Sequence, residues 1–290
     1  MMKLIKIIAV LLFYCISLNS FAFGKSPVWK ISKSGNHLFI GGTIHVLTQS
    51  DYPLPKIFET AYDNSKILVL ETDIQKFSTS EYQHTILEKT IYKDEQNITQ
   101  FLKSDVIHSL KTYLWQRDIP MESLIKLKPG MLSIFLTVIE LQRIGLNGTG
   151  VDEFFNLKAI KEEKKIKHLE TVDDQLEFIA TMGIGNENAF IEYFLNDLKN
   201  LSKTFKSMKK AWRNGDNAQL QIVALEPWKN HFPKIYNSLL VERNNNWIPQ
   251  IEEMLSTDEV EFILFGAAHL VGEDGIIEKL KASGCIVENL

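Results

Sequence analysis

Two segments near opposite ends of the chain share one pattern, and each of them ends in a histidine. Residues 38–45 and 262–269 each begin with an apolar stretch typical of a buried strand. A glycine, two small or apolar residues and then His45 or His269 follow. Glycine allows a backbone turn or the close approach of another group, and ligands of open α/β sheets bind beyond the carboxyl ends of the strands. One Gly-x-x-His motif is weak evidence, because such a histidine is more often hydrogen-bonded in a loop or core, but two are informative.

A glutamate supplies a third candidate for the same site. Glu71 directly follows the apolar run at residues 68–70, so a central parallel strand would place it on the same edge as His45. Histidine and carboxylate side chains are common ligands of zinc, manganese and cobalt, and an open coordination position allows a bound water to be activated. Without a metal, a histidine–glutamate pair can carry out general acid–base catalysis. The residue types leave both interpretations open, beside a plain helix cap or surface carboxylate at Glu71.

Two further acidic residues have positions that suit either a supporting or a structural role. Glu170 follows a predicted strand at residues 165–169, so it is expected to support the site as an outer carboxylate or to cap a helix, more often the latter. Asp152 precedes a helix expected to start near Glu153, where it could cap that helix or project into the cleft.

The elements that must position these residues alternate between strands and helices, which predicts an α/β fold. Residues 28–31 and 37–40 are expected to form a hairpin around a turn at 34–36. Further strands are expected at 66–70, 165–169, 261–265 and 285–287. Helices are expected at 53–62, 104–117, 131–144, 190–212 and 233–255. The strands cluster towards the two ends, so we expect a sheet built from the N- and C-terminal parts with a large helical middle region.

The predicted helix at residues 131–144 is almost entirely apolar. It is too short to span a membrane. A buried core helix is the simplest interpretation, and a helix that lines a groove is the alternative.

The N-terminus has the pattern of a secretory signal peptide. Lys3 and Lys6 precede an uncharged apolar run at residues 7–18, and Ala22 follows small residues of the kind that a signal peptidase recognises. We therefore expect residues 1–22 to be a signal peptide and residues 23–290 to form a single domain. The mature protein would be periplasmic or secreted, without a stable membrane span. Cys285 would be its lone cysteine, more typical of a buried strand than of a nucleophile.

Composition and missing motifs exclude several classes of function. The formal net charge of −4 gives no basic domain of the kind that binds nucleic acid. No Gly-x-Ser-x-Gly sequence is present for a serine nucleophile, and no Gly-x-x-x-x-Gly-Lys loop is present for a nucleotide phosphate. A peptide or small-molecule substrate is the expected partner.

Taken together, these residues resemble the TraB/GumN family (also written TraB/PrgY/GumN), which includes the Tiki-type proteases of animals. The resemblance covers nearly the whole mature chain and rests on ordered blocks. They lie at residues 41–45, 52–55, 127–129, 150–152, 168–171, 211–216, 242–244 with Trp247, and 266–275. The family includes proteins linked to peptide pheromones and to a polysaccharide gene cluster, so membership alone does not define a substrate.

The resemblance implies an α/β core in which two pseudo-repeated halves each supply a Gly-x-x-His motif, together with a glutamate. In the Tiki-type branch such residues are taken to form a metal-dependent peptidase site. His45, Glu71 and His269 are therefore implied as catalytic residues and as ligands of a divalent metal (Mn, Co or Zn). Asp152 and Arg243 are implied as supporting residues. The planar fork of Arg243 suits an anionic transition state or substrate carboxylate, or a structural ion pair.

Two classes of function remain after the sequence analysis. The leading hypothesis is a metal-dependent, peptidase-like hydrolase acting in the periplasm, with the same residues acting without a tightly held metal as a variant of it. The alternative is a non-catalytic protein that binds or sequesters a peptide or signal molecule in a groove between its long helices. Most aromatic residues of those helices are better explained as core.

Overall fold

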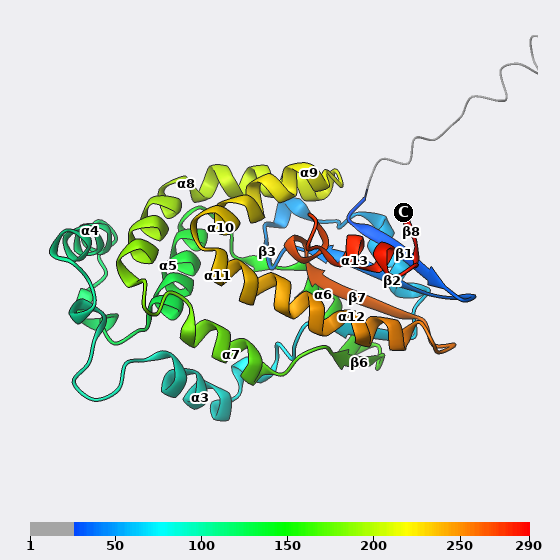
Figure 1. Ribbon diagram of the computed structural model, residues 1–290, viewed down its shortest axis with the longest axis horizontal. Coiled ribbons are helices and arrows are strands. Elements are labelled where there is room, and N and C mark those ends of the chain that lie inside the picture. The colour runs from blue at the N-terminus through cyan, green and yellow to red at the C-terminus, as the bar shows by residue number, and fades with distance from the viewer. Residues whose placement is uncertain (1–25) are drawn as a thin grey trace, which may run out of the picture.

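The computed structural model describes residues 26–290, so the predicted signal peptide at residues 1–22 lies outside the described residues. The main sheet has six strands in the order β6-β4-β7-β2-β1-β8 (Figure 1). Their bounds are β1 Val28–Lys33, β2 Asn36–Thr43, β4 Ile67–Leu70, β6 Lys165–His168, β7 Glu261–Gly266 and β8 Ile286–Asn289. Two short strands, β3 (Val46–Leu47) and β5 (Gly148–Thr149), form a separate antiparallel pair.

Four neighbouring strands of the sheet are parallel. β7 pairs in parallel with β2 on one side and with β4 on the other, and β4 pairs in parallel with the edge strand β6. Inner parallel strands are covered on both faces, which explains the near-continuous apolar sequences of β4 and β7, whereas β6 has polar, exposed residues. All four residues of β4 are buried, as are Glu261–Phe265 of β7. The carboxyl ends of these four strands therefore lie along one edge of the sheet.

The remaining two strands extend the sheet on its N-terminal side. The predicted hairpin is confirmed: β1 and β2 pair antiparallel around Ser34 and Gly35, both of which have positive φ. β8 pairs antiparallel with β1, so the end of the chain closes that side of the sheet. Cys285 is buried as predicted, but it lies just before the strand β8 and not within it.

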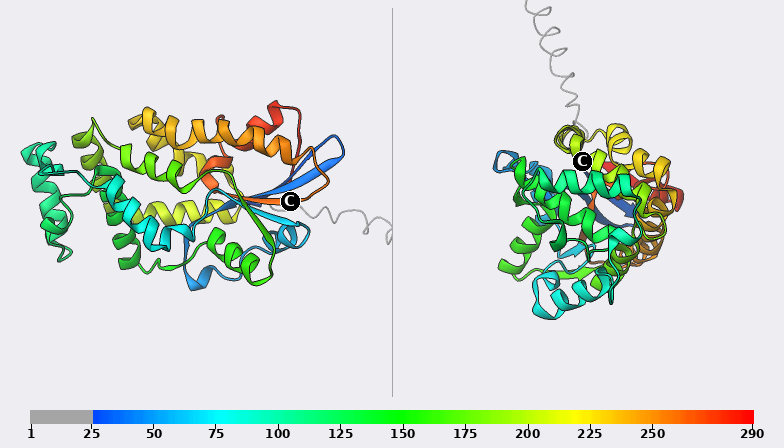
Figure 2. Two further views of the ribbon diagram at one scale, coloured as in Figure 1. Left: turned by 90° about the horizontal axis from the view of Figure 1, so that it is seen from below. Right: turned by 90° about the vertical axis from the view of Figure 1, so that its left-hand side faces the viewer.

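The middle of the chain forms a helical region beyond the edge where the parallel strands end (Figures 1 and 2). A mixed α/β fold with a sheet from both ends of the chain and a helical middle was the prediction, and it is confirmed. Its helices are α3 Ser80–Thr90, α4 Ser104–Trp115, α5 Pro129–Arg143, α7 Val172–Thr181, α8 Glu187–Arg213 and α10 Glu226–His231. The helices α2 Lys56–Asp63, α6 Val151–Lys161 and α13 Ile276–Ala282 lie nearer the sheet. One hydrophobic core surrounds the sheet, and a second fills the region around α4, α5 and α8.

The predicted helix at residues 233–255 differs from the expectation in one respect. It is interrupted by a π-helical segment, Asn237–Glu242, between α11 (Pro233–Tyr236) and α12 (Arg243–Met254). A second π-helical segment, Gln221–Leu225, lies in the same part of the chain. Such segments are rare and often occur at functional sites, and both of them border the cavity described below.

The apolar helix α5 is only partly a core helix. Leu132 and Leu136 are buried in the second core, whereas Phe135 and Val138 are 40% and 46% exposed. A third face, which includes Ile134, lines a cavity, so the groove-lining alternative accounts for that face. No helix among residues 26–290 combines the length and apolar character needed to cross a bilayer.

Candidate functional site

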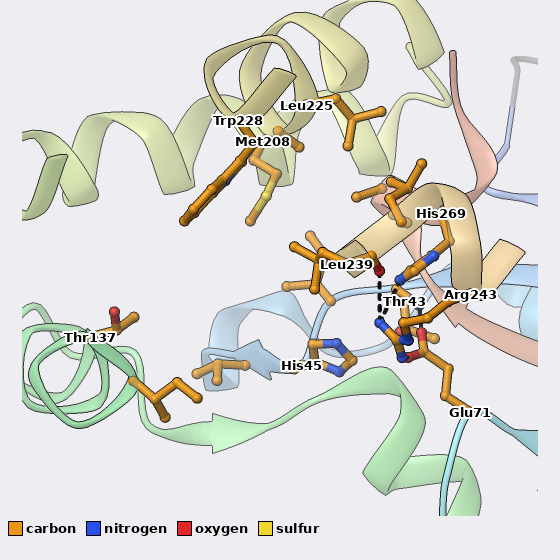
Figure 3. Close-up of a pocket in the computed structure, with 18 of the residues that line it drawn as sticks. Thr43, His45, Glu71, Thr137, Met208, Leu225, Trp228, Leu239, Arg243 and His269 are labelled. Atoms are coloured by element: carbon orange, nitrogen blue, oxygen red, sulfur yellow. Dashed lines mark hydrogen bonds and ion pairs between the residues drawn. The ribbon is translucent and has the colours of Figure 1, made fainter. Parts of the chain in front are cut away.

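Each of the four parallel strands delivers one candidate residue to the same edge of the sheet. His45 follows β2, Glu71 follows β4 directly, and Glu170 follows β6. His269 lies in a short 3₁₀ helix, Ala267–Leu270, that follows β7. The strand order β6-β4-β7-β2 brings these segments side by side although they are far apart in the sequence. The structure therefore brings together the residues that the sequence analysis selected, and Figure 3 shows His45, Glu71, Arg243 and His269 among them.

Arg243, the first residue of α12, is the centre of this group. A guanidinium has five N–H donors, and Arg243 uses them on five acceptors. Two go to Glu170, from Nε at 3.0 Å and from Nη2 at 2.7 Å, and a third goes from Nη2 to Glu71 Oε2 at 2.6 Å. Nη1 donates to Leu239 O at 3.2 Å and lies 3.1 Å from His269 Nε2. With no donor left over, Arg243 holds its neighbours in position in this arrangement.

Glu71 is held as a carboxylate from two sides. The backbone N–H of Gly266 donates to Oε1 at 2.7 Å, and Arg243 binds Oε2. Burial alone would raise the pKa of Glu71, but His269, Arg243 and His45 together with the Gly266 N–H lower it to about 2. Each carboxylate oxygen can accept two hydrogen bonds, so Glu71 retains acceptor capacity towards the cavities that it lines.

His269 is buried, and both of its ring nitrogens have partners. Nδ1 lies 2.7 Å from the amide oxygen of Asn244, which can only accept, so Nδ1 carries the proton and Nε2 accepts from Arg243. The ring packs on Trp247 with centroids 4.8 Å apart. Burial lowers the pKa of His269 to about 4, and the Arg243 charge acts in the same direction against the opposing effect of Glu71. His269 is therefore neutral at pH 7.

His45 has the opposite environment. Its Nδ1 lies 3.1 Å from Asp152 Oδ2, and its side chain is 65% exposed. The negative charge of Asp152 is the largest influence and raises the pKa of His45 to about 9, with Glu71 adding to it and burial opposing it. Asp152 lies in the first turn of α6, which begins at Val151 without a side-chain cap, so it faces His45 and does not cap the helix. Glu170 likewise binds Arg243, and Thr171 caps the following helix.

The reactive atoms converge on Gly266, the last residue of β7. A Cβ atom added there would lie 3.4 Å from both Glu71 Oε1 and His45 Nε2, and 3.7 Å from His269 Cδ2. These are ordinary van der Waals distances, so the side chains of Glu71, His45 and His269 all border the space beside Gly266 without being crowded there.

Sequence reasoning missed two threonines at this site. Thr43 and Thr72 are each 2% exposed, and their hydroxyl oxygens have no hydrogen-bond partner among the described residues; the same holds for Asp152 Oδ1. All three residues line a cavity of about 320 Å³ together with His45 and Glu71. Buried polar atoms normally have partners, so these atoms are suited to bind a ligand or water. Thr43 lies inside the first motif and Thr72 directly follows Glu71, and that position was the available signal.

A larger cavity of about 580 Å³ adjoins the same group of residues. It lies within the size range of small-molecule sites. Its polar end consists of Thr43, His45, Glu71, Arg243 and His269 at the sheet edge. The rest of its wall comes from α5, α7, α8, α10 and the two π-helical segments, and is mostly apolar (Figure 3).

The metal implied by the resemblance was to be held by His45, Glu71 and His269, and the arrangement of these side chains does not fit one. No three His, Cys, Asp or Glu side chains within residues 26–290 are grouped so that they could hold a metal ion. The physical reason is Arg243, whose guanidinium contacts Glu71 Oε2 and His269 Nε2, the atoms that would face the ion. Binding a metal through these atoms requires the Arg243 side chain to move, and the metal stays a prediction.

Comparison with known proteins gives one match, at the level of a family. The model of the TraB/PrgY/gumN family matches residues 27–289, nearly the whole chain and all of the strands and helices that form the site. No curated protein and no solved structure matches the chain.

Proposed function

The chain belongs to the TraB/PrgY/gumN family, and from that premise we propose that it hydrolyses an amide or peptide bond at this edge of the sheet. One observation carries the proposal: Glu71 Oε1 and the Nε2 of His45, whose Nδ1 pairs with Asp152, both lie beside Gly266, at the polar end of a cavity large enough for a substrate. Two titratable groups whose environments separate their pKa values are the usual basis for an acid and a base in one site.

His45 is the acid of the proposed reaction. Its raised pKa keeps it protonated at pH 7, and with Nδ1 held by Asp152 its Nε2–H points to the side where Glu71 lies. A proton donated from Nε2 to the leaving nitrogen would allow the carbon–nitrogen bond to break with release of a neutral amine.

Glu71 is the base that acts on the attacking water. The Gly266 N–H and Arg243 fix its carboxylate, while its remaining lone pairs can accept a hydrogen bond from water. Its low pKa makes it a weak base in the resting site, but a bound substrate would exclude water, and burial raises the pKa of a carboxyl group. The water proton passes to Glu71 and then to His45, which restores both side chains after one turnover.

The other residues of the group position these two. Arg243 and Asn244 contact the two ring nitrogens of His269 and keep it neutral in a single tautomer. His269 and Glu170 in turn fix the position of the Arg243 guanidinium. Thr43 is the proposed hydrogen-bond donor to the substrate carbonyl oxygen, because its buried hydroxyl at the cavity wall has no partner among the described residues. A fixed donor of this kind stabilises the charge that develops on that oxygen.

The first test compares two site variants with a control variant on strand β2. His45→Gln and Glu71→Gln should each lower the kcat for a peptide or amide substrate by a factor of about 100 or more. His37→Gln, a substitution near the start of the same strand β2, should leave it unchanged. Turnover is measured by mass spectrometry of the products, and unfolding of each variant is followed by circular dichroism. Full activity in both site variants would contradict the proposal.

Metal content is the accompanying measurement. Elemental mass spectrometry of the purified protein, before and after incubation with manganese, cobalt and zinc, tests the implied divalent metal. Stoichiometric metal that is lost in both His45→Ala and His269→Ala would show that Arg243 leaves its position on metal binding. Activity that survives a chelator, with no metal bound, would support the acid–base steps described above.

Sequestration without catalysis is the second candidate, and the large apolar cavity is the observation that favours it. It predicts saturable ligand binding with no product, in wild type and in Glu71→Gln alike.

We also propose that the protein acts in the periplasm, because residues 1–22 have the pattern of a signal peptide. N-terminal sequencing of the exported protein should begin after Ala22.

A further inference from the structure

The cavity of about 580 Å³ has its charged groups and histidines at one end only. His45, Glu71, Arg243 and His269 lie together at the sheet edge, whereas Thr137, Met208 and Trp228 lie away from them along the walls formed by α5, α8 and α10 (Figure 3). A bound molecule that places a carbonyl carbon beside Glu71 and His45 must therefore extend its remaining atoms into the apolar part of the cavity.

The rest of the cavity offers a ligand few hydrogen-bonding side chains: the amide of Gln175, the indole N–H of Trp228 and two hydroxyls. Helices α5, α7 and α8 satisfy their interior backbone groups internally. The Thr137 hydroxyl donates to Ser133 O at 2.8 Å, and the Tyr236 hydroxyl donates to Asp274 Oδ2 at 2.9 Å. These two hydroxyls are thus already used, and the surrounding surface is made of side chains such as Ile134, Phe205, Met208 and Leu225.

This distribution separates two kinds of apolar ligand. A peptide carries an N–H and a C=O on nearly every residue, and each such group is costly to bury without a partner. A linear hydrocarbon chain has no polar atom along its length and gains free energy from burial alone. Met208, an unbranched and adaptable side chain, suits the packing of a flexible chain.

We propose that this cavity binds a linear acyl chain, so that the substrate is an N-acyl amide whose acyl carbonyl is attacked at Glu71 and His45. This rests on the proposed function for the identity of the bond that is cut. Water adds its oxygen to the acyl carbon, the carbon–nitrogen bond breaks, and the nitrogen leaves with the proton from His45. A free fatty acid and an amine are the products. At roughly 30 Å³ per methylene-sized group, and with incomplete filling, the cavity holds a chain of on the order of 12 carbons.

The experiment measures chain-length dependence in binding and in turnover. Calorimetry with straight-chain alkanoates of 4 to 16 carbons should show affinity rising roughly three- to four-fold per methylene, up to a plateau near the length that fills the cavity. Turnover of N-acyl-glycines of the same lengths should follow the same profile. An N-dodecanoyl peptide compared with N-dodecanoyl-glycine then tells whether a lipopeptide or a free N-acyl amino acid is the better source of the chain.

Two adjacent residues of α5 provide a matched pair of variants. Thr137 lines the cavity, whereas Val138 is 46% exposed and does not. Thr137→Trp should move the plateau to a shorter chain and lower dodecanoate affinity at least 10-fold, and Val138→Trp should change neither. Ile134→Phe, a smaller change on the same face of α5, repeats the test if Thr137→Trp does not fold.

The outcomes separate this inference from the proposed function. Affinity that does not depend on chain length, or tighter binding of acetyl-trileucine amide than of dodecanoate, overturns the acyl-chain site. Chain-length-dependent binding that Thr137→Trp shortens, without cleavage of any N-acyl amide, establishes the acyl site and refutes the hydrolase.

Discussion

Replacing Arg243 by methionine should destabilise the protein strongly, because it removes one cation from a group of buried anions. The side chains of Arg243, Glu71 and Glu170 are 15%, 13% and 9% exposed. Methionine keeps the apolar stem but leaves both carboxylates without their shared partner. Removing one partner from a buried ion pair costs about 3–5 kcal/mol, so we expect the free energy of unfolding at pH 7 to fall by this amount.

The loss should depend on pH in a defined direction. The pKa of Glu71 is lowered in the folded protein from 4.5 to about 2, which corresponds to about 3 kcal/mol of stability. A carboxyl group whose pKa is lower in the folded than in the unfolded protein stabilises the fold fully at pH values above its unfolded pKa. This stabilisation is lost as the pH falls towards and through the folded pKa. Arg243 is the second-largest cause of the lowered pKa, after His269, so part of the lowering disappears without Arg243. The difference in the free energy of unfolding between wild type and Arg243→Met should therefore be largest above pH 5 and should decrease between pH 4.5 and 2.

Urea unfolding at pH 7 and pH 3 tests this reasoning, with Arg117→Met as the control. Arg117 binds Glu140 at 2.8 Å, and the two side chains are 11% and 13% exposed, so this pair resembles the site in burial but lies apart from it. Arg117→Met should also destabilise, yet the folded variant should keep the wild-type kcat, which Arg243→Met should lose. A destabilisation of Arg243→Met below about 1 kcal/mol, or an equal loss at both pH values, would refute the argument.

Three further predictions concern the histidines and their neighbours. Asp152→Asn removes the largest cause of the raised pKa of His45, so the alkaline limb of the pH–rate profile should move from about 9 towards 6.5, since His45 must be protonated to act as the acid; an unmoved limb argues against that role. Gly266→Ala places a Cβ 3.4 Å from His45 Nε2, so kcat should fall while the melting temperature changes little, as kinetics and calorimetry would show. Asn244→Leu leaves the Nδ1–H of His269 and the carbonyls of His269 and Asp274 without partners and should cost about 1–3 kcal/mol per buried group left unpaired. Asn244→Asp also loses the two donated hydrogen bonds, but it keeps an acceptor for the Nδ1–H and adds a negative charge, so it should raise the pKa of His269 in an NMR titration.

The strands of the main sheet were predictable from local sequence, whereas the two-residue strands β3 and β5 were not predicted. β4 and β7 are short apolar runs buried on both faces, and the β1–β2 turn contains glycine at a position with positive φ. The interruption at Asn237–Glu242 was not predictable, since the apolar periodicity continues through it. The mixed character of α5 was equally hidden, because its sequence is apolar on faces that prove to be buried, cavity-lining or exposed.

At the site, sequence position predicted which residues meet but not how their atoms pair. His45, Glu71 and His269 could be placed on one edge because each follows an apolar run, and parallel strands end at the same edge. The pairing of Arg243 with Glu170 depends on the position of α12 over the sheet, across 73 residues of sequence. Saturation of the Arg243 donors is a property of three-dimensional contacts, so the sequence could not indicate that this cation lies where a metal was expected.

The histidines of the two Gly-x-x-His motifs therefore differ in their ability to transfer a proton, although the two motifs are alike in sequence. His269 has both ring nitrogens engaged, is 7% exposed and is kept neutral. His45 has one nitrogen oriented by Asp152 and the other directed towards Glu71, and most of its side chain is accessible. A proton carrier needs a free nitrogen and access to the substrate, and only His45 meets both conditions in this arrangement. If a metal displaced Arg243, His269 Nε2 would be freed and the asymmetry would decrease, so the protonation states of the two histidines, measured by NMR with and without metal, distinguish the two forms of the site.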